Sequence, residues 1–306
     1  MFKIEELRGV LPALVTPLKQ DGTADEPAIQ RLVEHVLAGG VHGLLALGST
    51  GEAASLDEPT RRKVLAGVVE VAAARVPVIC GVAQSHLAAA CAEVKAAAGL
   101  GAVAALVTPP YYYPIDQATV LAFYRRLAAE SPLPVLVYNI PQFTKVVTEP
   151  TTVATLAREG AVVGIKDSSR DFEYFESVCA ATRDLPDFRI FTGSDSMLLA
   201  SLAVGGAGTI CAAANIAPGW VVRIYEEFER GDWDAARSHQ DVLLDFGRAV
   251  RVGVFPAAIK AALNLQGVCD PWLAAPVAPL DEPSEARLRE QLEAWGLLAA
   301  VSQVNT

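Results

Sequence analysis

The sequence predicts an α/β fold, a (β/α)8 TIM barrel with a C-terminal helical extension. Eight short apolar segments alternate with helical patterns in one unbroken series over residues 1–230. The short segments are apolar on both faces, which is typical of parallel strands that are covered on both sides. An unbroken strand–helix series favours a barrel over a doubly wound sheet. The chain has 306 residues, enough for one such barrel.

The expected strands are short runs rich in Val, Ile, Leu and Ala. They lie near residues 10–15, 43–47, 77–82, 102–107, 133–138, 161–166, 189–192 and 207–211. The expected helices lie near residues 25–39, 57–74, 86–99, 116–130, 149–158, 171–182, 194–205 and 216–230. Ser55 with Glu58 resembles a capping box, and Pro150 suits the first turn of a helix.

Only helical patterns follow the eighth unit. They lie near residues 232–250, 255–265 and 284–300. We therefore expect a barrel domain at residues 1–230 and a helical extension, packed on the barrel, at residues 231–306.

Composition excludes several classes of function. The net charge is −10 and no Lys/Arg run occurs, which argues against nucleic-acid binding. No apolar stretch has the length of a membrane span, and the first residues lack the pattern of a secretory signal. The five cysteines are scattered, which predicts reduced thiols in a cytoplasmic protein. No His or Cys spacing is typical of a metal site.

Lys166 ends the sixth apolar run, in Gly-Ile-Lys-Asp-Ser at residues 164–168. Lysine is seldom buried, because moving its ammonium out of water is costly. A lysine here is therefore either a surface group or an amine kept neutral for chemistry. Lys260 is also in apolar company, but its mid-helix position predicts that its ammonium reaches solvent.

Three other unusual motifs follow expected strands, where barrel chemistry gathers. Gly-Ser-Thr-Gly-Glu at residues 48–52 offers N–H groups and hydroxyls to a carboxylate, or is a plain turn with a second capping box. Thr-Pro-Pro-Tyr-Tyr-Tyr-Pro at residues 108–114 is a stiff aromatic loop that suits packing or subunit contact as well as chemistry. Tyr138 closes the fifth strand and is either structural or a phenol that relays protons.

The ordered set of motifs resembles one family. GSTGE, PPYYYP, YNIP and GIKDSS are followed by Thr-Gly-Ser-Asp at residues 192–195 and Gly-Thr-Ile at residues 208–210. Together they are similar to the dihydrodipicolinate synthase / N-acetylneuraminate lyase family of pyruvate-dependent class I aldolases and lyases. The resemblance covers nearly the whole chain. It implies a homotetramer built from tight dimers, with no metal and no organic cofactor.

The resemblance also implies roles for individual residues. Lys166 corresponds to the Schiff-base lysine, and Tyr138 to the tyrosine that moves protons. Ser49 and Thr50, in the turn that begins at Gly48, correspond to the pair that grips the carboxylate of the keto acid.

Three further positions follow from the same resemblance. Tyr111, or alternatively Tyr112, corresponds to the tyrosine supplied to the proton relay of a neighbouring subunit. Ile210 corresponds to the residue whose backbone faces bound pyruvate, and Gly193 lines the substrate end of the site.

The second substrate depends on departures from the family pattern. Phe143 stands where the dihydrodipicolinate synthases carry an arginine for the carboxylate of the aldehyde, and a phenyl ring cannot form that pair. Lys145 is nearby, with a different spacing. Ser196 stands where the sialate lyases usually carry an acidic residue. The PPYYYP and Lys-Asp motifs more resemble the 2-keto-3-deoxy acid aldolases and dehydratases.

We therefore expect a metal-independent lyase that joins pyruvate to an aldehyde, or cleaves a 2-keto-3-deoxy sugar acid or related hydroxy-oxo acid to them. The alternative is dihydrodipicolinate synthase, which condenses pyruvate with aspartate semialdehyde. An alternative of another class is a non-catalytic barrel that binds a 2-oxo acid. Such a barrel would be expected to lose Lys166 or Tyr138 first, and the chain keeps both.

Overall fold

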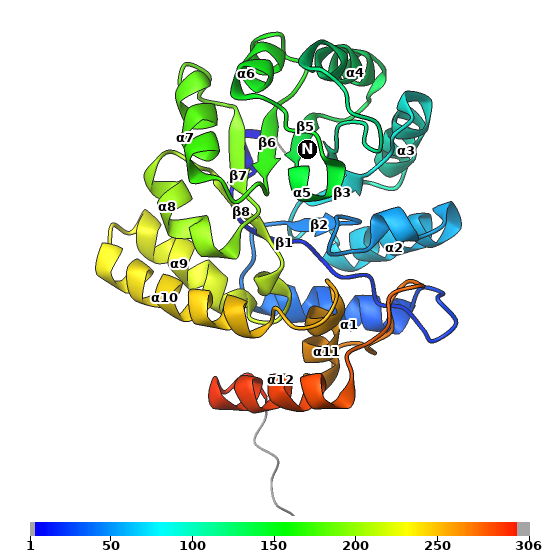
Figure 1. Ribbon diagram of the computed structural model, residues 1–306, viewed down its shortest axis with the longest axis vertical. Helices are drawn as coiled ribbons and strands as arrows, with labels where there is room; N and C mark the ends of the chain where they lie inside the picture. The colour runs from blue at the N-terminus through cyan, green and yellow to red at the C-terminus, as the bar shows by residue number, and fades with distance from the viewer. Residues whose placement is uncertain (1–3, 299–306) are drawn as a thin grey trace, which may run out of the picture.

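Eight parallel strands form a barrel in the computed structural model, which describes residues 4–298 (Figure 1). The strands are β1 (Gly9–Pro12), β2 (Leu44–Ala46), β3 (Val78–Val82), β4 (Ala104–Val107), β5 (Val135–Asn139), β6 (Gly164–Asp167), β7 (Arg189–Thr192) and β8 (Gly208–Cys211). Their order is β1-β8-β7-β6-β5-β4-β3-β2, and a parallel bridge between Ala13 and Leu45 joins the two ends of that series. The predicted TIM barrel is confirmed.

Helices follow the strands along the chain and surround the barrel (Figure 1). They are α1 (Glu26–Ala38), α2 (Glu58–Ala72), α3 (Leu87–Gly99), α4 (Gln117–Glu130), α5 (Pro141–Thr144), α6 (Pro150–Arg158), α7 (Phe172–Ala181), α8 (Leu198–Ala203) and α9 (Pro218–Glu229). The sequence did not predict α5, because four residues are too few to show a helical period. No helix within residues 4–298 is long and apolar enough to cross a membrane.

Three more helices follow the barrel: α10 (Trp233–Ala249), α11 (Ala257–Leu265) and α12 (Glu282–Ala294). The helical pattern expected near residues 284–300 runs past residue 298 and so ends outside the described residues. We propose a division of the chain after residue 230, since Gly231, with a φ of 80°, separates α9 from α10.

One local prediction is wrong. Asp57, not Ser55, caps the N-terminus of α2, and its carboxylate accepts a hydrogen bond from the backbone N–H of Thr60 at 2.9 Å. Ser55 instead ends a short 3-10 turn, and Glu58 is the first residue of the helix, so the two cannot form a capping box. Pro150 begins α6 as expected.

The apolar core has two parts. A large cluster packs the helices against the outer face of the sheet, and a smaller one fills the barrel. The buried members of the smaller cluster are Leu7, Leu11, Ala13, Leu45, Ile79, Ala104, Leu106, Leu136, Tyr138, Ile140, Phe191 and Ile210. Side chains alternate along a strand, and residues paired across neighbouring strands point the same way. Because Lys166 is paired with Tyr138, both side chains enter the barrel.

Candidate active site

Lys166 lies inside the barrel near the carboxyl end of β6. Its side chain is 3% exposed, and its amine lies 3.4 Å from the hydroxyl oxygen of Tyr138 and 4.5 Å from the centre of that ring. A surface lysine whose head group reaches solvent does not fit this burial. The position is that of an amine sheltered inside the barrel.

The hydroxyl of Ser49, in the loop after β2, is the second group that contacts the Tyr138 phenol. The Oγ of Ser49 lies 3.2 Å from the hydroxyl oxygen of Tyr138, and either group can donate the hydrogen bond. Thr50 is buried beside it, and Ser49, Thr50, Tyr138 and Lys166 all line one cavity of about 430 Å³. Amine, phenol and hydroxyl therefore form one hydrogen-bonded series on the cavity wall.

The turn that carries these hydroxyls is held in a strained conformation. Leu47 and Glu52, on either side of it, have φ values of 60° and 57°, which residues with a Cβ rarely adopt. The carbonyl oxygen of Gly51 accepts a hydrogen bond from Thr16 Oγ1 at 2.6 Å. Such strain persists only where surrounding contacts fix the backbone, and Glu52 supplies two of them.

Glu52 links this turn to the C-terminal helices. Its Oε2 accepts a hydrogen bond from the backbone N–H of Ala274 at 2.8 Å, and its Oε1 lies 2.5 Å from the Nζ of Lys260 in α11. The Lys260 amine also donates to the carbonyl oxygen of Trp272 at 2.6 Å. Glu52 is therefore not the end of a capping box but one half of a buried ion pair.

The prediction for Lys260 is wrong. Its side chain is 0% exposed, so its ammonium does not reach solvent. Burial lowers the pKa of Lys260, and the neighbouring Glu52 carboxylate opposes that shift. The error arises because nearly all of α11 is covered, which its own sequence does not reveal.

Gly193 and Ile210 line the same cavity. A Cβ at position 193 would lie 2.0 Å from Ser168 Oγ and 2.9 Å from Lys166 Cε. Only glycine therefore leaves room for these two side chains where they stand. Ile210 is fully buried in the barrel interior.

The tyrosine loop divides into two kinds of residue. Tyr111 is half-buried, donates its phenol to the carbonyl oxygen of Ala83 at 3.1 Å, and shares a second hollow of about 300 Å³ with Ser49 and Tyr138. Tyr112 is 83% exposed, has a φ of 86°, and packs edge-to-face against the exposed ring of Tyr113.

Phe143 lines both hollows, is 56% exposed and lies 6.3 Å from the ring of Phe255. Lys145 does not line the larger cavity, and its amine donates to the carbonyl oxygen of Gln142 at 2.9 Å. Ser196 also lies outside the lining and contacts Ser194 at 2.9 Å between hydroxyl oxygens.

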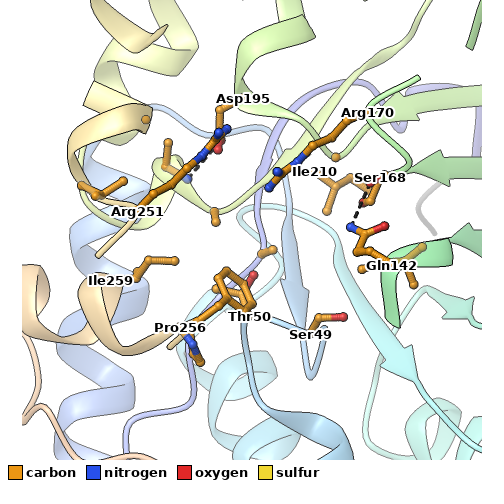
Figure 2. A pocket seen from close by; sticks show the side chains of 18 of the residues that line it. Ser49, Thr50, Gln142, Ser168, Arg170, Asp195, Ile210, Arg251, Pro256 and Ile259 are labelled. Atoms are coloured by element: carbon orange, nitrogen blue, oxygen red, sulfur yellow. Dashed lines mark hydrogen bonds between the residues drawn. The ribbon is translucent and has the colours of Figure 1, made fainter. Parts of the chain in front are cut away.

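Sequence reasoning missed the two arginines of this cavity, Arg170 and Arg251 (Figure 2). Arg170 follows β6 by three residues, so the rule that sites gather after strand ends could have found it. Arg251 lies between α10 and α11, and no local sequence pattern predicts that this segment reaches the cavity.

The carboxylate of Asp167 points away from Lys166 and organises the loop behind it. Asp167 accepts hydrogen bonds from Asn139 Nδ2 at 2.7 Å and from Ser169 Oγ at 2.8 Å. Burial raises the pKa of Asp167, and these hydrogen bonds oppose the shift. The described residues contain no cluster of three or more His, Cys, Asp and Glu side chains suited to a metal ion.

The fold and cavity define a TIM-barrel protein with its site at the carboxyl ends of the strands, the arrangement of enzymes of this architecture. The model of the dihydrodipicolinate synthetase family matches residues 6–295. The chain therefore belongs to this family.

Individual relatives and solved structures of the same family are similar to the chain over nearly its whole length. A 4-hydroxy-tetrahydrodipicolinate synthase of Hyphomonas neptunium is 38% identical over 289 residues, which are 94% of this chain and 98% of the relative. A solved monomeric dihydrodipicolinate synthase variant has a TM-score of 0.93 and 32% identity, covering 96% of this chain and 99% of its own. YagE, a prophage protein of E. coli K12 solved in complex with pyruvate, has a TM-score of 0.92 and 29% identity, covering 95% and 99%.

The buried ion pair predicts a large loss of stability when it is broken on one side. Replacing Lys260 by methionine keeps most of the length of the side chain but leaves the Glu52 carboxylate buried without its partner. We expect Lys260→Met to lower the free energy of unfolding by about 3–5 kcal/mol in urea titrations.

The matched control is Lys95→Met, which breaks an exposed pair with Glu130 and should cost less than about 1 kcal/mol. Adding Glu52→Gln to Lys260→Met should recover part of the loss. Equal stability of Lys260→Met and Lys95→Met would show that the buried pair does not anchor the turn.

Proposed function

We propose that the chain is a Schiff-base (class I) aldolase or lyase that makes or breaks a C–C bond between pyruvate and an aldehyde. The observation that carries the proposal is the series Lys166–Tyr138–Ser49, with contacts of 3.4 and 3.2 Å on the wall of one cavity. A sheltered amine beside a phenol that reaches a further hydroxyl is what imine chemistry needs.

In this mechanism the Lys166 amine adds to the C2 carbonyl of the keto acid, and Tyr138 supplies the proton that the oxygen needs to leave as water. The iminium then withdraws electrons, so C3 loses a proton and an enamine forms. The enamine carbon bonds to the aldehyde carbon, whose oxygen takes up a proton. Water finally releases the product and restores the amine, and the reverse sequence cleaves the same bond.

The carboxylate of the keto acid is proposed to bind at the turn of Ser49 and Thr50. Both residues line the cavity next to Tyr138, and the turn offers hydroxyl and backbone N–H donors. In this position the carboxylate lies next to the Ser49 hydroxyl, which contacts the Tyr138 phenol. The rest of the substrate is proposed to occupy the part of the cavity that is lined by Gly193 and Ile210.

We also propose that the chain works as a homotetramer of tight dimers. Of the two candidate tyrosines, the geometry supports Tyr112 as the residue given to a neighbouring subunit. Its ring is exposed and its φ is strained, whereas the Tyr111 phenol already bonds within its own chain. Exposed aromatic rings are typical of subunit contacts.

The proposed larger substrate is a 2-keto-3-deoxy sugar acid or a related hydroxy-oxo acid. Phe143 lines the cavity at the position expected for a carboxylate-binding arginine, and Lys145 is turned toward its own backbone. Condensation of pyruvate with aspartate semialdehyde is the alternative, supported by relatives named 4-hydroxy-tetrahydrodipicolinate synthase.

The relay gives the first prediction for activity. We expect Tyr138→Phe to lower aldol turnover by about 10²–10⁴-fold, because the ring stays in place while the proton-transferring hydroxyl is lost. Exchange of the methyl protons of pyruvate in D2O, followed by NMR, should slow in parallel. The control is Tyr113→Phe, an exposed phenol outside the cavity. Equal rates in the two variants would contradict the role of Tyr138.

The choice of aldehyde is tested with a panel in which pyruvate is offered with glyceraldehyde, glyoxylate, aspartate semialdehyde or N-acetylmannosamine. We expect product to form fastest with a hydroxyaldehyde, and Phe143→Arg to gain activity with aspartate semialdehyde because it restores a bidentate donor. A strong preference of the unaltered enzyme for aspartate semialdehyde would favour the alternative function.

A further inference from the structure

Two arginines enter the cavity from different parts of the chain. Arg170 comes from the loop after β6, and Arg251 comes from the segment between α10 and α11. Figure 2 shows the guanidinium ends of both side chains on one side of the cavity, with Ser49 and Thr50 on the other. Two guanidinium groups therefore face the part of the cavity that the keto-acid carboxylate does not use.

Neither arginine has an ion-pair partner among residues 4–298. Both side chains are exposed, and neither donates a side-chain hydrogen bond within the described residues, whereas Arg125 and Arg158 pair with acidic side chains. Arg170 also has a φ of 64°, a conformation that costs free energy for a residue with a Cβ. Strained residues of this kind cluster at ligand sites, which agrees with a binding role.

The charged lining of the cavity is unlike the rest of the molecule. Beside the Lys166 amine it contains two guanidinium groups, Arg170 and Arg251, and one acidic side chain, Asp195. The whole chain, by contrast, has a net charge of −10. Burial raises the pKa of Asp195, and the backbone N–H of Ala213 and the charge of Arg251 oppose that shift. A cavity of this charge favours an anionic ligand.

The C1 carboxylate of the keto acid does not use the two arginines. In the proposed mechanism the C1 carboxylate lies at Ser49 and Thr50, and Lys166 becomes part of the imine. The arginines remain unused on the far side, with Ser168 and Gln142 lining the wall and able to contact hydroxyls between the two ends. The lining thus has an imine-forming centre with anion-binding groups on both sides.

We propose that Arg170 and Arg251 bind a second carboxylate, so that the preferred substrate is a dicarboxylic 2-keto-3-deoxy acid rather than one ending in a hydroxymethyl group. This inference rests on the proposed Schiff-base function. In the synthetic direction, C3 of the pyruvate enamine bonds to the aldehyde carbon of tartronate semialdehyde, whose oxygen takes up a proton. Water then releases 4,5-dihydroxy-2-oxohexanedioate, with no oxidant or reductant required.

The test compares two aldehydes of equal length that differ only at the far carbon. Tartronate semialdehyde ends in a carboxylate, and glyceraldehyde ends in a hydroxymethyl group. We expect the unaltered enzyme to show the higher kcat/KM with tartronate semialdehyde. Arg170→Met and Arg251→Met should each lower the ratio of the two kcat/KM values about tenfold, because a charge-assisted bond to the carboxylate is lost.

Two further variants separate binding from a general effect of charge. Arg170→Lys should lower the ratio less than Arg170→Met does, since the lysine ammonium keeps the positive charge but not the bidentate geometry of the guanidinium. Arg126→Met removes an exposed arginine of α4 outside the cavity and should leave the ratio as it is. A ratio near one in the unaltered enzyme, or a ratio that survives loss of both arginines, would overturn the inference.

Exchange of the pyruvate methyl protons in D2O distinguishes this failure from failure of the proposed function, because the exchange needs the enamine but no aldehyde. Exchange by the unaltered enzyme without a preference for tartronate semialdehyde would overturn the second-carboxylate site alone. No exchange at all would overturn the Schiff-base function and, with it, this inference.

Discussion

The pairing of Tyr138 with Lys166 across β5 and β6 is the constraint on which the site depends. Because paired residues on parallel neighbours point to the same face, this register sends a lysine and a phenol together into the barrel. A shift of one residue would turn the lysine toward the surrounding helices instead. The 3.4 Å contact between the two groups is therefore a property of the sheet, not of a flexible loop.

Other parts of the fold serve this pair. The turn with Ser49 meets the Tyr138 phenol at 3.2 Å, and its strained backbone is tied by Glu52 to Lys260 and the segment after α11. The helices after the barrel thereby support the turn and also bring Arg251 to the cavity. The chemistry proposed for the strand ends consequently depends on residues more than 200 positions apart in the chain.

The sequence predicted the barrel well because strand and helix periods are local, and each strand carries its own apolar signal. The strand-end rule also indicated Lys166, Tyr138 and Ser49, which line one cavity because barrel topology brings strand ends together. Sequence reasoning failed for residues whose position depends on long-range packing. Lys260 is buried by contacts that α11 alone does not encode, and Arg251 reaches the cavity only once the C-terminal helices have docked.

Trapping with borohydride tests the central claim most directly, namely that the amine buried beside Tyr138 condenses with a keto acid. The protein is incubated with pyruvate, reduced, digested and analysed by mass spectrometry. We predict one reduced adduct, on the peptide that contains Lys166, and none on the peptide that contains the equally buried Lys260. An adduct elsewhere, or no adduct at all, would contradict the account.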